Sequence, residues 1–526
     1  MGKVKIKEAM LIHITSARCV GIDALPVTVE VNIDRGIGIH LVGLADAAVK
    51  ESLLRTITAL QSLGFHIPGK KIVINLAPAD MHKKGSGYDL PIALGIIAAS
   101  GQKELPLLER FLILGELGLD GSVRPVPGAL PAAELASSME LDGCILPVES
   151  AREAAEYGMG RVYGVRSLSE ALGILEGSGG CSAMQAAEGD VFESPGGRPR
   201  SSAYMDFADI VGQDEAKRGA EIAAAGGHNL ILMGPPGAGK SSLAKAIAGI
   251  LPPMTREEAL VTSKIYSVSG VPGPAGGLVR VRPFRAPHYS ASLASVIGGG
   301  NGDNVVPGEV SLAHGGVLFL DEFAQMPKSV AEALRGPLED RKVVVSRLRS
   351  KVEYPCSFML VAASNPCPCG YYGEGDRCTC TAGQRLGYLS RLSGPLMDRV
   401  DLQVRMRPVP ASSLVHKVRA EPSSAVAARV LEARAIQKER FAGTPVSTNA
   451  GMDVKLIERF CPLSPACADL LERIIRTRDL SARAYYRIIR VARTIADLAG
   501  SGDILPEHIA EASSYRFLDR RGVLDL

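Results

Sequence analysis

The spacing of apolar and polar side chains along the chain predicts both strands and helices. Residues 27–33 alternate apolar and polar positions, which is typical of a strand with one buried face. Residues 46–63 place apolar side chains at helical intervals and are followed by Gly64, so they predict an amphipathic helix. Three short runs are continuously apolar, as in parallel strands that are buried on both faces. These runs are residues 230–233, 317–320 and 358–363.

Composition changes along the chain divide it into four parts, in line with the roughly three folded domains expected at this length. Residues 1–175 are predicted to form a mixed α/β domain. Residues 176–206 are rich in Gly, Pro and Ser, as in a flexible linker. Residues 207–410 are predicted to form an α/β core with a parallel sheet, and residues 411–526 a helical domain. The predicted fold class is therefore α/β.

Charge and hydropathy narrow the environment in which we expect the protein to act. The formal net charge is +3, so a surface that binds nucleic acid would have to be local. No run reaches the roughly 18–20 apolar residues of a membrane span, and the first residues do not resemble a signal peptide. We therefore expect a cytoplasmic protein without a membrane partner. Its ten cysteines are expected to be reduced unless they bind metal.

A Gly-rich turn follows the first apolar run and precedes a helix-forming segment, residues 242–250. This is the P-loop pattern in its expected strand–loop–helix setting. Glycines allow backbone N–H groups to surround a phosphate, Lys240 neutralises phosphate charge, and the hydroxyl of Ser241 is suited to Mg²⁺. The residues expected to bind ATP here are Gly234, Pro235, Pro236, Gly237, Ala238, Gly239, Lys240, Ser241 and Ser242.

Polar residues follow the other two apolar runs. Asp321 and Glu322 come directly after the second run, and Asn365 closely follows the third. Asp321 is expected to hold Mg²⁺ together with Ser241, and Glu322 to polarise a water for attack on the γ-phosphate. The Asn365 amide is suited to orienting that water. These residues predict a nucleoside triphosphate hydrolase that uses ATP and Mg²⁺.

Other residues are predicted to complete the ATP site. Ile210 and Val211 lie upstream of the P-loop and are candidate adenine contacts, although burial without ligand contact explains them nearly as well. Arg399 is predicted to be an arginine finger that reaches the γ-phosphate of a neighbouring subunit, with Arg391 as the alternative. Arg483, at the start of a helix, is predicted to sense phosphate; a solvated basic helix face is the alternative.

Two Cys-x-Cys pairs follow Asn365. Pairs separated by a short loop are able to converge on one tetrahedral zinc ion, although Cys-x-Cys is tighter than the usual spacing. The alternative is four reduced thiols in a packed loop. The candidate zinc ligands are Cys367, Cys369, Cys378 and Cys380.

Two basic segments are candidates for contact with DNA. One is a long Gly/Pro-rich insertion between Thr262 and Gly316, and long loops of this kind are usually functional. The other is a predicted hairpin over residues 341–354 with basic tips. Closely spaced arginines suit phosphate contacts, and a solvated face is the alternative. The candidate residues are Arg280, Arg282, Arg285, Lys342 and Arg347.

Two segments of the first domain, residues 78–90 and 115–121, resemble landmarks of the Lon-protease-type domain, which implies an α+β fold like domain 2 of ribosomal protein S5. Lon-type proteases use a Ser–Lys pair. In this sequence the Ser position falls on Gly87 and the Lys position on Leu130, and no Lys is identified to activate Ser86. We therefore predict a non-proteolytic domain that serves assembly or ligand contact.

Nearly the whole chain resembles the bacterial magnesium-chelatase-like AAA+ ATPases of the YifB/ComM type. The motifs that carry the resemblance, in chain order, are Gly-Pro-Pro-Gly-Ala-Gly-Lys-Ser, Pro-Gly-Glu-Val-Ser-Leu-Ala-His, Leu-Phe-Leu-Asp-Glu, Asn-Pro-Cys-Pro-Cys-Gly, Ser-Gly-Pro-Leu-Met-Asp-Arg-Val-Asp and Leu-Ser-Ala-Arg-Ala-Tyr. The resemblance implies an AAA+ core with a helical lid, usually a hexameric ring, and ATP hydrolysis at subunit interfaces. It assigns P-loop, Walker B, sensor and finger roles to Lys240, Asp321, Glu322, Asn365, Arg399 and Arg483.

The resemblance favours a DNA motor, because proteins of the ComM type are linked to natural transformation as ring helicases that migrate DNA branches in recombination. An alternative is a chelatase-type remodeller that acts on a protein partner in metal insertion. The Lon-like domain argues against that alternative, since the chelatase motor subunit is not expected to carry one. Regulated proteolysis is a third hypothesis, and it lacks the Ser–Lys pair.

Overall fold

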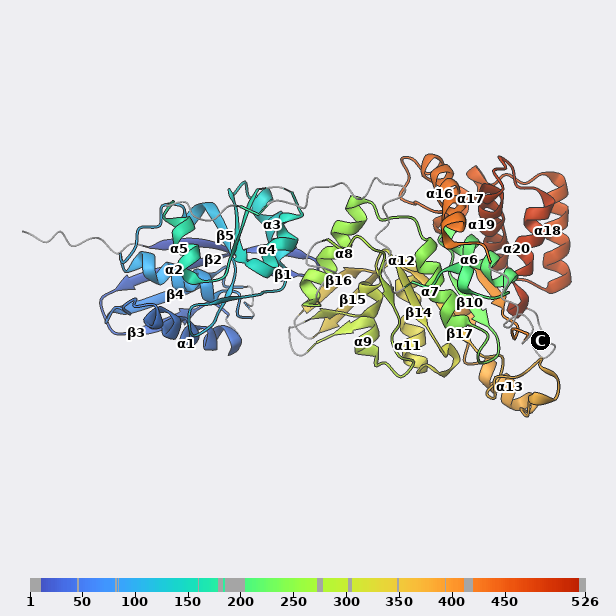
Figure 1. Ribbon diagram of the computed structural model, residues 1–526, viewed down its shortest axis with the longest axis horizontal. Helices are drawn as coiled ribbons and strands as arrows, with labels where there is room; N and C mark the ends of the chain where they lie inside the picture. Colours follow the sequence, from blue (N-terminus) through green and yellow to red (C-terminus); the bar gives the residue numbers. More distant parts are fainter. Residues whose placement is uncertain are drawn as a thin grey trace, which may run out of the picture.

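The computed structural model describes residues 11–44, 47–80, 83, 85–158, 160–177, 183–184, 204–271, 278–300, 305–347, 350–392, 394–410 and 420–519. Most of the predicted linker, residues 176–206, therefore lies outside the described residues. In Figure 1 the N-terminal elements lie at one end of the molecule and the C-terminal helices at the other, with a second sheet between them. Within the described residues, no helix is both long and apolar enough to span a bilayer.

The N-terminal part contains a seven-stranded mixed sheet in the order β3-β4-β2-β1-β5-β8-β9. The predicted strand over residues 27–33 lies within β2, where Val27, Val29 and Val31 are fully buried. The strands are β1 (Ile12–Val20), β2 (Asp23–Asp34), β3 (Gly38–Val42), β4 (Lys71–Ala77), β5 (Phe111–Ile113), β8 (Gly143–Pro147) and β9 (Arg161–Val165), with a small hairpin of β6 (Glu116–Leu117) and β7 (Val123–Arg124).

Helices pack against this sheet and bury its apolar side chains. The predicted amphipathic helix over residues 46–63 is α1 (Ala47–Ser62). The most buried helix is α2 (Asp89–Ala99), in which residues 89 to 97 are all buried because it lies in the core of this domain. The remaining helices of the domain are α3 (Ala129–Ser138), α4 (Val148–Ala155) and α5 (Leu168–Leu175).

A five-stranded, fully parallel sheet forms the centre of the second domain, in the order β11-β14-β17-β10-β18. The three apolar runs form β10, β14 and β17, and every residue of these three strands is buried, as predicted. The strands are β10 (Leu230–Met233), β11 (Phe284–Arg285), β14 (Val317–Leu320), β17 (Met359–Ser364) and β18 (Leu402–Arg405). Because the strands are parallel, the segments that follow them all emerge at one edge of the sheet.

Short helices and two hairpins surround this sheet. The predicted hairpin over residues 341–354 is the antiparallel pair β15 (Lys342–Arg347) and β16 (Ser350–Pro355). The region between Thr262 and Gly316 is not a single long loop: α8, α9, α10 and the strands β11, β12 (Gly298–Gly299) and β13 (Val306–Pro307) lie within or across it. The helices are α6 (Asp214–Gly226), α7 (Lys240–Ile250), α8 (Arg256–Ser269), α9 (Leu293–Ile297), α10 (Glu309–Leu312), α11 (Lys328–Ala333), α12 (Arg335–Asp340), α13 (Ala382–Leu389) and α14 (Gly394–Met397).

The C-terminal part is helical, as predicted. One continuous apolar cluster joins it to the central domain: Leu230 and Val361 of the sheet, Ala220 of α6 and Ile488 of α19 all belong to it. The C-terminal helices are therefore fixed to one side of the sheet rather than tethered loosely (Figure 1). They are α16 (Ser423–Arg440), α17 (Val454–Phe460), α18 (Pro465–Arg478), α19 (Ala482–Leu498) and α20 (Pro506–Ser514).

Helix α8 connects the central domain to the N-terminal domain. The N–H of Gly128 donates to the carbonyl of Ser267 at 2.9 Å, and the Ser267 hydroxyl donates to Glu153 at 2.6 Å. Lys264 forms ion pairs with Glu134 and Asp23 of the N-terminal domain. Burial raises the pKa of Glu153, although the Ser267 hydroxyl partly opposes this. These contacts hold the first domain against the side of the core that carries α8.

Candidate nucleotide-binding site

The P-loop follows β10 directly and ends where α7 begins, at Lys240. Gly237 and Gly239 have φ angles of 78° and 88°. Other residues adopt such angles only with strain, so the turn requires glycine at both positions. Helix α7 begins at Lys240 and is 11 residues long. The positive end of its dipole therefore lies at the end of the P-loop, where it stabilises an anion.

Lys240 connects the P-loop to the neighbouring strand. Its Nζ donates to the carbonyl oxygens of Gly234 at 2.7 Å and Pro235 at 2.9 Å, and to Oδ1 of Asn365 at 3.0 Å. Burial lowers the pKa of Lys240, while the charges of Asp321 and Glu322 act in the opposite direction. A partly desolvated ammonium in this position is poised to gain from a phosphate group.

The hydroxyl and carboxylate predicted to hold Mg²⁺ lie in direct contact. Ser241 Oγ donates to Asp321 Oδ2 at 2.9 Å, and the backbone N–H of Glu322 donates to Asp321 Oδ1 at 2.9 Å. Hydroxyl and carboxylate oxygens are the donors that Mg²⁺ prefers, so these residues fit that ion. Glu322 has a φ of 48°, a left-handed conformation that is uncommon outside glycine and that occurs often at functional sites.

The strand order explains why these residues meet. Strand β17 lies between β10 and β14, so Asn365 lies between the P-loop and the acidic pair. All three strands end at the same edge of the parallel sheet. The sequence separations are large, 125 residues for Lys240 and Asn365 and 80 for Ser241 and Asp321.

The candidate adenine contacts lie beside the P-loop. Ile210 is buried in the core, and Val211 is half-buried. Gln213 anchors their segment, because its Nε2 donates to the carbonyls of Ala238 at 3.2 Å and Arg407 at 2.6 Å. Sequence reasoning did not identify Gln213. Its left-handed φ of 62° directly before α6 is visible only in the structure.

A cavity lies at the opposite edge of the sheet, where the strands begin (the amino edge). This cavity of about 740 Å³ is lined by residues that precede the strands, among them Asn229, Gly316 and Phe358, and by residues of the C-terminal helices. Arg399 and Arg483 both line it. Within one chain, the structure therefore does not bring these two arginines to Lys240, which lies at the carboxyl edge.

Both arginines have acidic partners in the cavity wall. Arg399 donates to the carboxylate of Glu339 and lowers its pKa. Arg483 Nη1 donates to Asp398 Oδ2 at 2.8 Å, and its side chain is 67% exposed, so it remains accessible. The sequence predicted neither acid as a partner, although Asp398 belongs to the same motif as Arg399 and directly precedes it.

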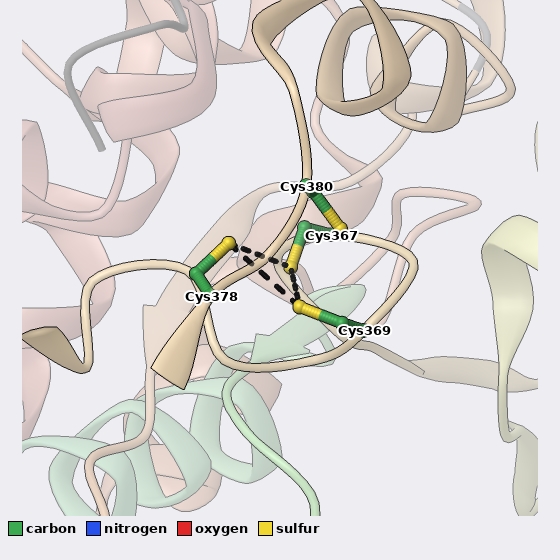
Figure 2. A group of neighbouring side chains, drawn as sticks. All are labelled: Cys367, Cys369, Cys378 and Cys380. Carbon is green, nitrogen blue, oxygen red and sulfur yellow. Dashed lines mark hydrogen bonds between the residues drawn. The ribbon is translucent and has the colours of Figure 1, made fainter. Parts of the chain in front are cut away.

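The four cysteines of the Cys-x-Cys pairs converge, as Figure 2 shows. Their sulfurs all lie within 4.8 Å of one another. Cys367 Sγ lies 3.3 Å from Cys369 Sγ and 3.8 Å from Cys378 Sγ, and the sulfurs of Cys369 and Cys378 are 3.7 Å apart. Four sulfurs about 2.3 Å from one tetrahedral zinc ion are about 3.8 Å apart, so the donor set fits zinc.

The insertion arginines lie in internal contacts. Arg280 pairs with Glu156 of the N-terminal domain at 3.0 Å, and Arg285 forms two hydrogen bonds to Glu309 at 2.6 and 2.7 Å. Arg282 donates to Glu258 at 2.9 Å and to three backbone carbonyls. As placed, these side chains support the fold rather than presenting free charge.

The hairpin candidates differ from the insertion arginines. Lys342 is half-exposed and pairs with Glu353 across the hairpin at 3.2 Å. Lys351, opposite Ser346, is also exposed. The side chain of Arg347 lies outside the described residues. The hairpin therefore presents basic side chains at the surface.

Comparison with known proteins places the chain in a family. Models for the magnesium chelatase subunit ChlI match residues 206–414 and 29–150, and a model for the C-terminal part of that subunit matches residues 420–516. YifB of Escherichia coli is 40% identical over 522 residues, which cover 97% of each chain. The competence protein ComM of Haemophilus influenzae is 41% identical over 507 residues, 96% of this chain and 97% of ComM. The chain belongs to the magnesium-chelatase-like YifB/ComM family.

A more distant relative matches only part of the chain. The magnesium-chelatase 67 kDa subunit of Chlorobaculum parvum is 31% identical over 167 residues, 30% of this chain and 23% of that protein. The family assignment and the mixed α/β fold with a parallel sheet and a helical C-terminal region agree with the predicted AAA+ architecture. They support an AAA+ ATPase.

The N-terminal domain of this YifB/ComM family member does not assemble a Ser–Lys pair at Ser86 in the described structure. The Ser86 hydroxyl donates to the carboxylate of Glu116. Lys83 is fully buried and donates to the carbonyl of Pro78. Burial lowers the pKa of Lys83. These partners agree with the absence of the Lon-type residues at positions 87 and 130.

Proposed function

We propose that the chain is a ring-forming AAA+ ATPase that couples ATP hydrolysis to movement on DNA, as a branch-migration helicase in recombination during natural transformation. The observation that carries the ATPase part is the convergence of Lys240, Ser241, Asp321 and Asn365 at one edge of the parallel sheet. Few functions other than nucleotide hydrolysis require an ammonium, a hydroxyl, a carboxylate and an amide around a P-loop.

Each residue has a role that its position supports. Lys240 binds the β- and γ-phosphates, and Ser241 with Asp321 holds Mg²⁺, which when bound neutralises phosphate charge. Glu322 follows Asp321 and accepts a proton from the attacking water. Asn365, which contacts Lys240 at 3.0 Å, orients that water.

The ring proposal rests on the two edges of the sheet. Lys240 lies at the carboxyl edge, whereas Arg399 and Arg483 line the cavity at the amino edge. One chain therefore cannot use all three on a single nucleotide without rearrangement. In a ring, the amino edge of one subunit faces the ATP of the next, and both arginines then reach its γ-phosphate. A hexamer is the ring size that the resemblance implies.

Replacing Arg399 by alanine is expected to lower the turnover number by about 10³-fold or more while nucleotide affinity stays within a few fold, because the finger acts on the transition state of the neighbouring site. Arg391→Ala tests the alternative finger, since Arg391 is exposed and close in sequence: it is expected to keep wild-type turnover, and a loss at Arg391 instead of Arg399 would move the finger role to Arg391. Mixing Arg399→Ala with Lys240→Ala protein is expected to restore turnover, because each supplies what the other lacks. Two variants that stay inactive when mixed would contradict action between subunits.

The DNA part of the proposal is supported by the relatives and by the hairpin. ComM of Haemophilus influenzae, which is 41% identical, is named a competence protein. The exposed lysines of the hairpin, Lys342 and Lys351, are suited to the phosphates of a strand in a central channel. Arg347 is a third candidate on the same hairpin. Because they have internal partners, Arg280, Arg282 and Arg285 are not part of the proposed DNA surface.

ATP turnover is expected to rise when DNA is added. The increase is expected to be larger with four-way branched DNA than with single-stranded or duplex DNA. Glu322→Gln protein serves as the blank. DNA affinity is expected to fall steeply with salt, because phosphate contacts release counterions. Lys342→Ala is expected to reduce both effects, whereas Lys455→Ala, which removes an exposed lysine on α17, should not. Turnover indifferent to every DNA would contradict the motor.

A second candidate function is a chelatase-type remodeller of a protein partner in metal insertion. The observation that favours it is the 31% identity between part of this chain and the magnesium-chelatase 67 kDa subunit. That similarity covers 30% of this chain, which leaves most of the chain unaccounted for. Turnover that responds to a partner protein and not to DNA would favour this alternative.

We further propose that the cofactors are ATP, Mg²⁺ and one zinc ion held by the four clustered cysteines. The sulfur distances of 3.3 to 3.8 Å among three of them support a tetrahedral site. Elemental analysis of the purified protein should find one zinc per chain.

A further inference from the structure

The cysteine loop, residues 365–381, connects the nucleotide site to helix α13. It begins at Asn365, whose Oδ1 accepts a hydrogen bond from Lys240 at 3.0 Å. Two residues later comes Cys367, the most buried member of the cluster. The loop ends at Thr381, which caps α13 together with Gln384. The loop therefore starts in the catalytic machinery and ends at a separate, well-capped helix.

The same loop packs directly on the P-loop. A Cβ atom built on Gly370 would lie 2.7 Å from Cδ and 2.9 Å from Cγ of Pro236. Gly370 also has a left-handed φ of 88°. No side chain fits between the two backbones, so the cysteine loop covers the P-loop proline at van der Waals distance. The position of the loop thus determines the space around residues 234–240.

Local contacts within the loop add to this packing. Among the described residues, two short turns form inside the loop, through hydrogen bonds from the N–H of Gly370 to the carbonyl of Cys367 at 3.0 Å and from the N–H of Glu374 to the carbonyl of Tyr371 at 3.0 Å. Arg385 stacks on Tyr372 at 4.2 Å. Thiols make weak hydrogen bonds, so four protonated cysteines would add little. A metal ion bound by all four would fix the loop at a single point.

We propose that the metal-bound cysteine loop is a positioning element of the P-loop: by holding Gly370 against Pro236 and Asn365 against Lys240, the bound zinc ion makes ATP turnover depend on metal. This inference rests on the proposed zinc site and on the proposed ATPase activity. Gly370 is a positioning residue, since it contacts the P-loop and not the nucleotide. The metal itself takes no part in hydrolysis.

The chain offers a matched pair of variants. Gly370 and Gly373 lie in the same loop and have nearly equal φ angles of 88° and 91°. A Cβ on Gly373 meets nothing within 4 Å, whereas a Cβ on Gly370 meets Pro236. Both positions have a left-handed φ that strains alanine to a comparable degree, so the difference between the two variants reports on the contact with the P-loop. Neither substitution removes a sulfur. Cys378→Ser removes a ligand.

The experiment measures zinc per chain, the turnover number, and hydrogen exchange of the P-loop amides, residues 234 and 237–240, for wild type, Gly370→Ala, Gly373→Ala, Cys378→Ser and chelator-treated wild type. Gly370→Ala is expected to keep its zinc but lose turnover by about 10²-fold, the usual cost of a misplacement near 1 Å, with faster exchange in the P-loop. Gly373→Ala is expected to match wild type. Cys378→Ser and chelated protein are expected to lose zinc, turnover and P-loop protection together.

Each other outcome overturns a specific statement. Wild type without zinc overturns the metal site and this inference, and leaves the ATPase proposal intact. Zinc-free protein with wild-type turnover and exchange overturns the inference alone, as does Gly370→Ala protein that behaves like Gly373→Ala. If wild type hydrolyses no ATP, the proposed function fails, and P-loop exchange still decides whether the metal positions the loop. Gly370→Ala keeps the test decisive if Cys378→Ser does not fold.

Discussion

Lys240→Ala protein is expected to have no measurable ATP turnover and weak nucleotide binding. In the structure Lys240 Nζ makes three hydrogen bonds, to the carbonyls of Gly234 and Pro235 and to Asn365. Burial lowers its pKa, which means that the ammonium is partly desolvated and gains strongly from a phosphate. Removing one hydrogen-bond donor that stabilises charge in the transition state lowers turnover by about 10²–10³-fold. Lys240→Ala is expected to weaken the binding of ATP itself as well.

The measurement is phosphate release at saturating ATP, together with the affinity of a fluorescent nucleotide. Lys245→Ala is the matched control, because Lys245 is an exposed lysine on the same helix, α7, one and a half turns further along. It is expected to retain wild-type values. Lys240→Ala protein that keeps more than a tenth of the wild-type rate would show that the P-loop is not the hydrolytic site.

The convergence of polar residues at the carboxyl edge of the sheet could be predicted from sequence because each motif is local. An apolar run followed directly by polar residues marks both Asp321 and Asn365. The parallel arrangement of β10, β14 and β17 then brings the ends of these runs to one edge. Side chains that are 80 and 125 positions apart in the sequence therefore come into contact. They could be predicted because buried, parallel strands place the residues that follow them at the same edge of the sheet.

Packing between domains could not be predicted in the same way. Arg399 and Arg483 line one cavity because the C-terminal helices cover the amino ends of the strands, and no local pattern encodes that choice of side. The partners of Arg280 and Arg285 lie 124 and 24 residues away. A basic cluster in the sequence says nothing about carboxylates that approach it only after folding.

The insertion illustrates a second limit. Its Gly and Pro content predicted a long irregular loop, yet β11 and α10 form within it. Strand β11 pairs with β14 through only two residues, Phe284 and Arg285. A two-residue strand has no periodicity to detect, so tertiary pairing decides it. The contact of Gly370 with Pro236 is invisible for the same reason: glycine leaves no pattern, and the neighbour is 134 positions away along the chain.

Glu322→Gln protein is expected to bind ATP with nearly wild-type affinity and to hydrolyse it about 10²–10⁴-fold more slowly, the range expected when a general base is removed. Glutamine has almost the same shape as glutamate, so the backbone of residue 322 is expected to keep its φ of 48°. Lys240 and the contact of Ser241 with Asp321 at 2.9 Å remain in place for the triphosphate and Mg²⁺.

The decisive comparison is between binding and turnover in the same preparation. Glu332→Gln is the control, because Glu332 is an exposed glutamate on α11 whose partner is Lys328 at 3.7 Å, and its loss should change neither quantity. If Glu322→Gln loses affinity and turnover in equal proportion, Glu322 supports the ground state and another group must accept the proton. If only turnover falls, the backbone geometry after β14 serves to orient a base toward the water, and ATP-bound protein accumulates as the state in which the proposed ring and its proposed DNA complex are best sought.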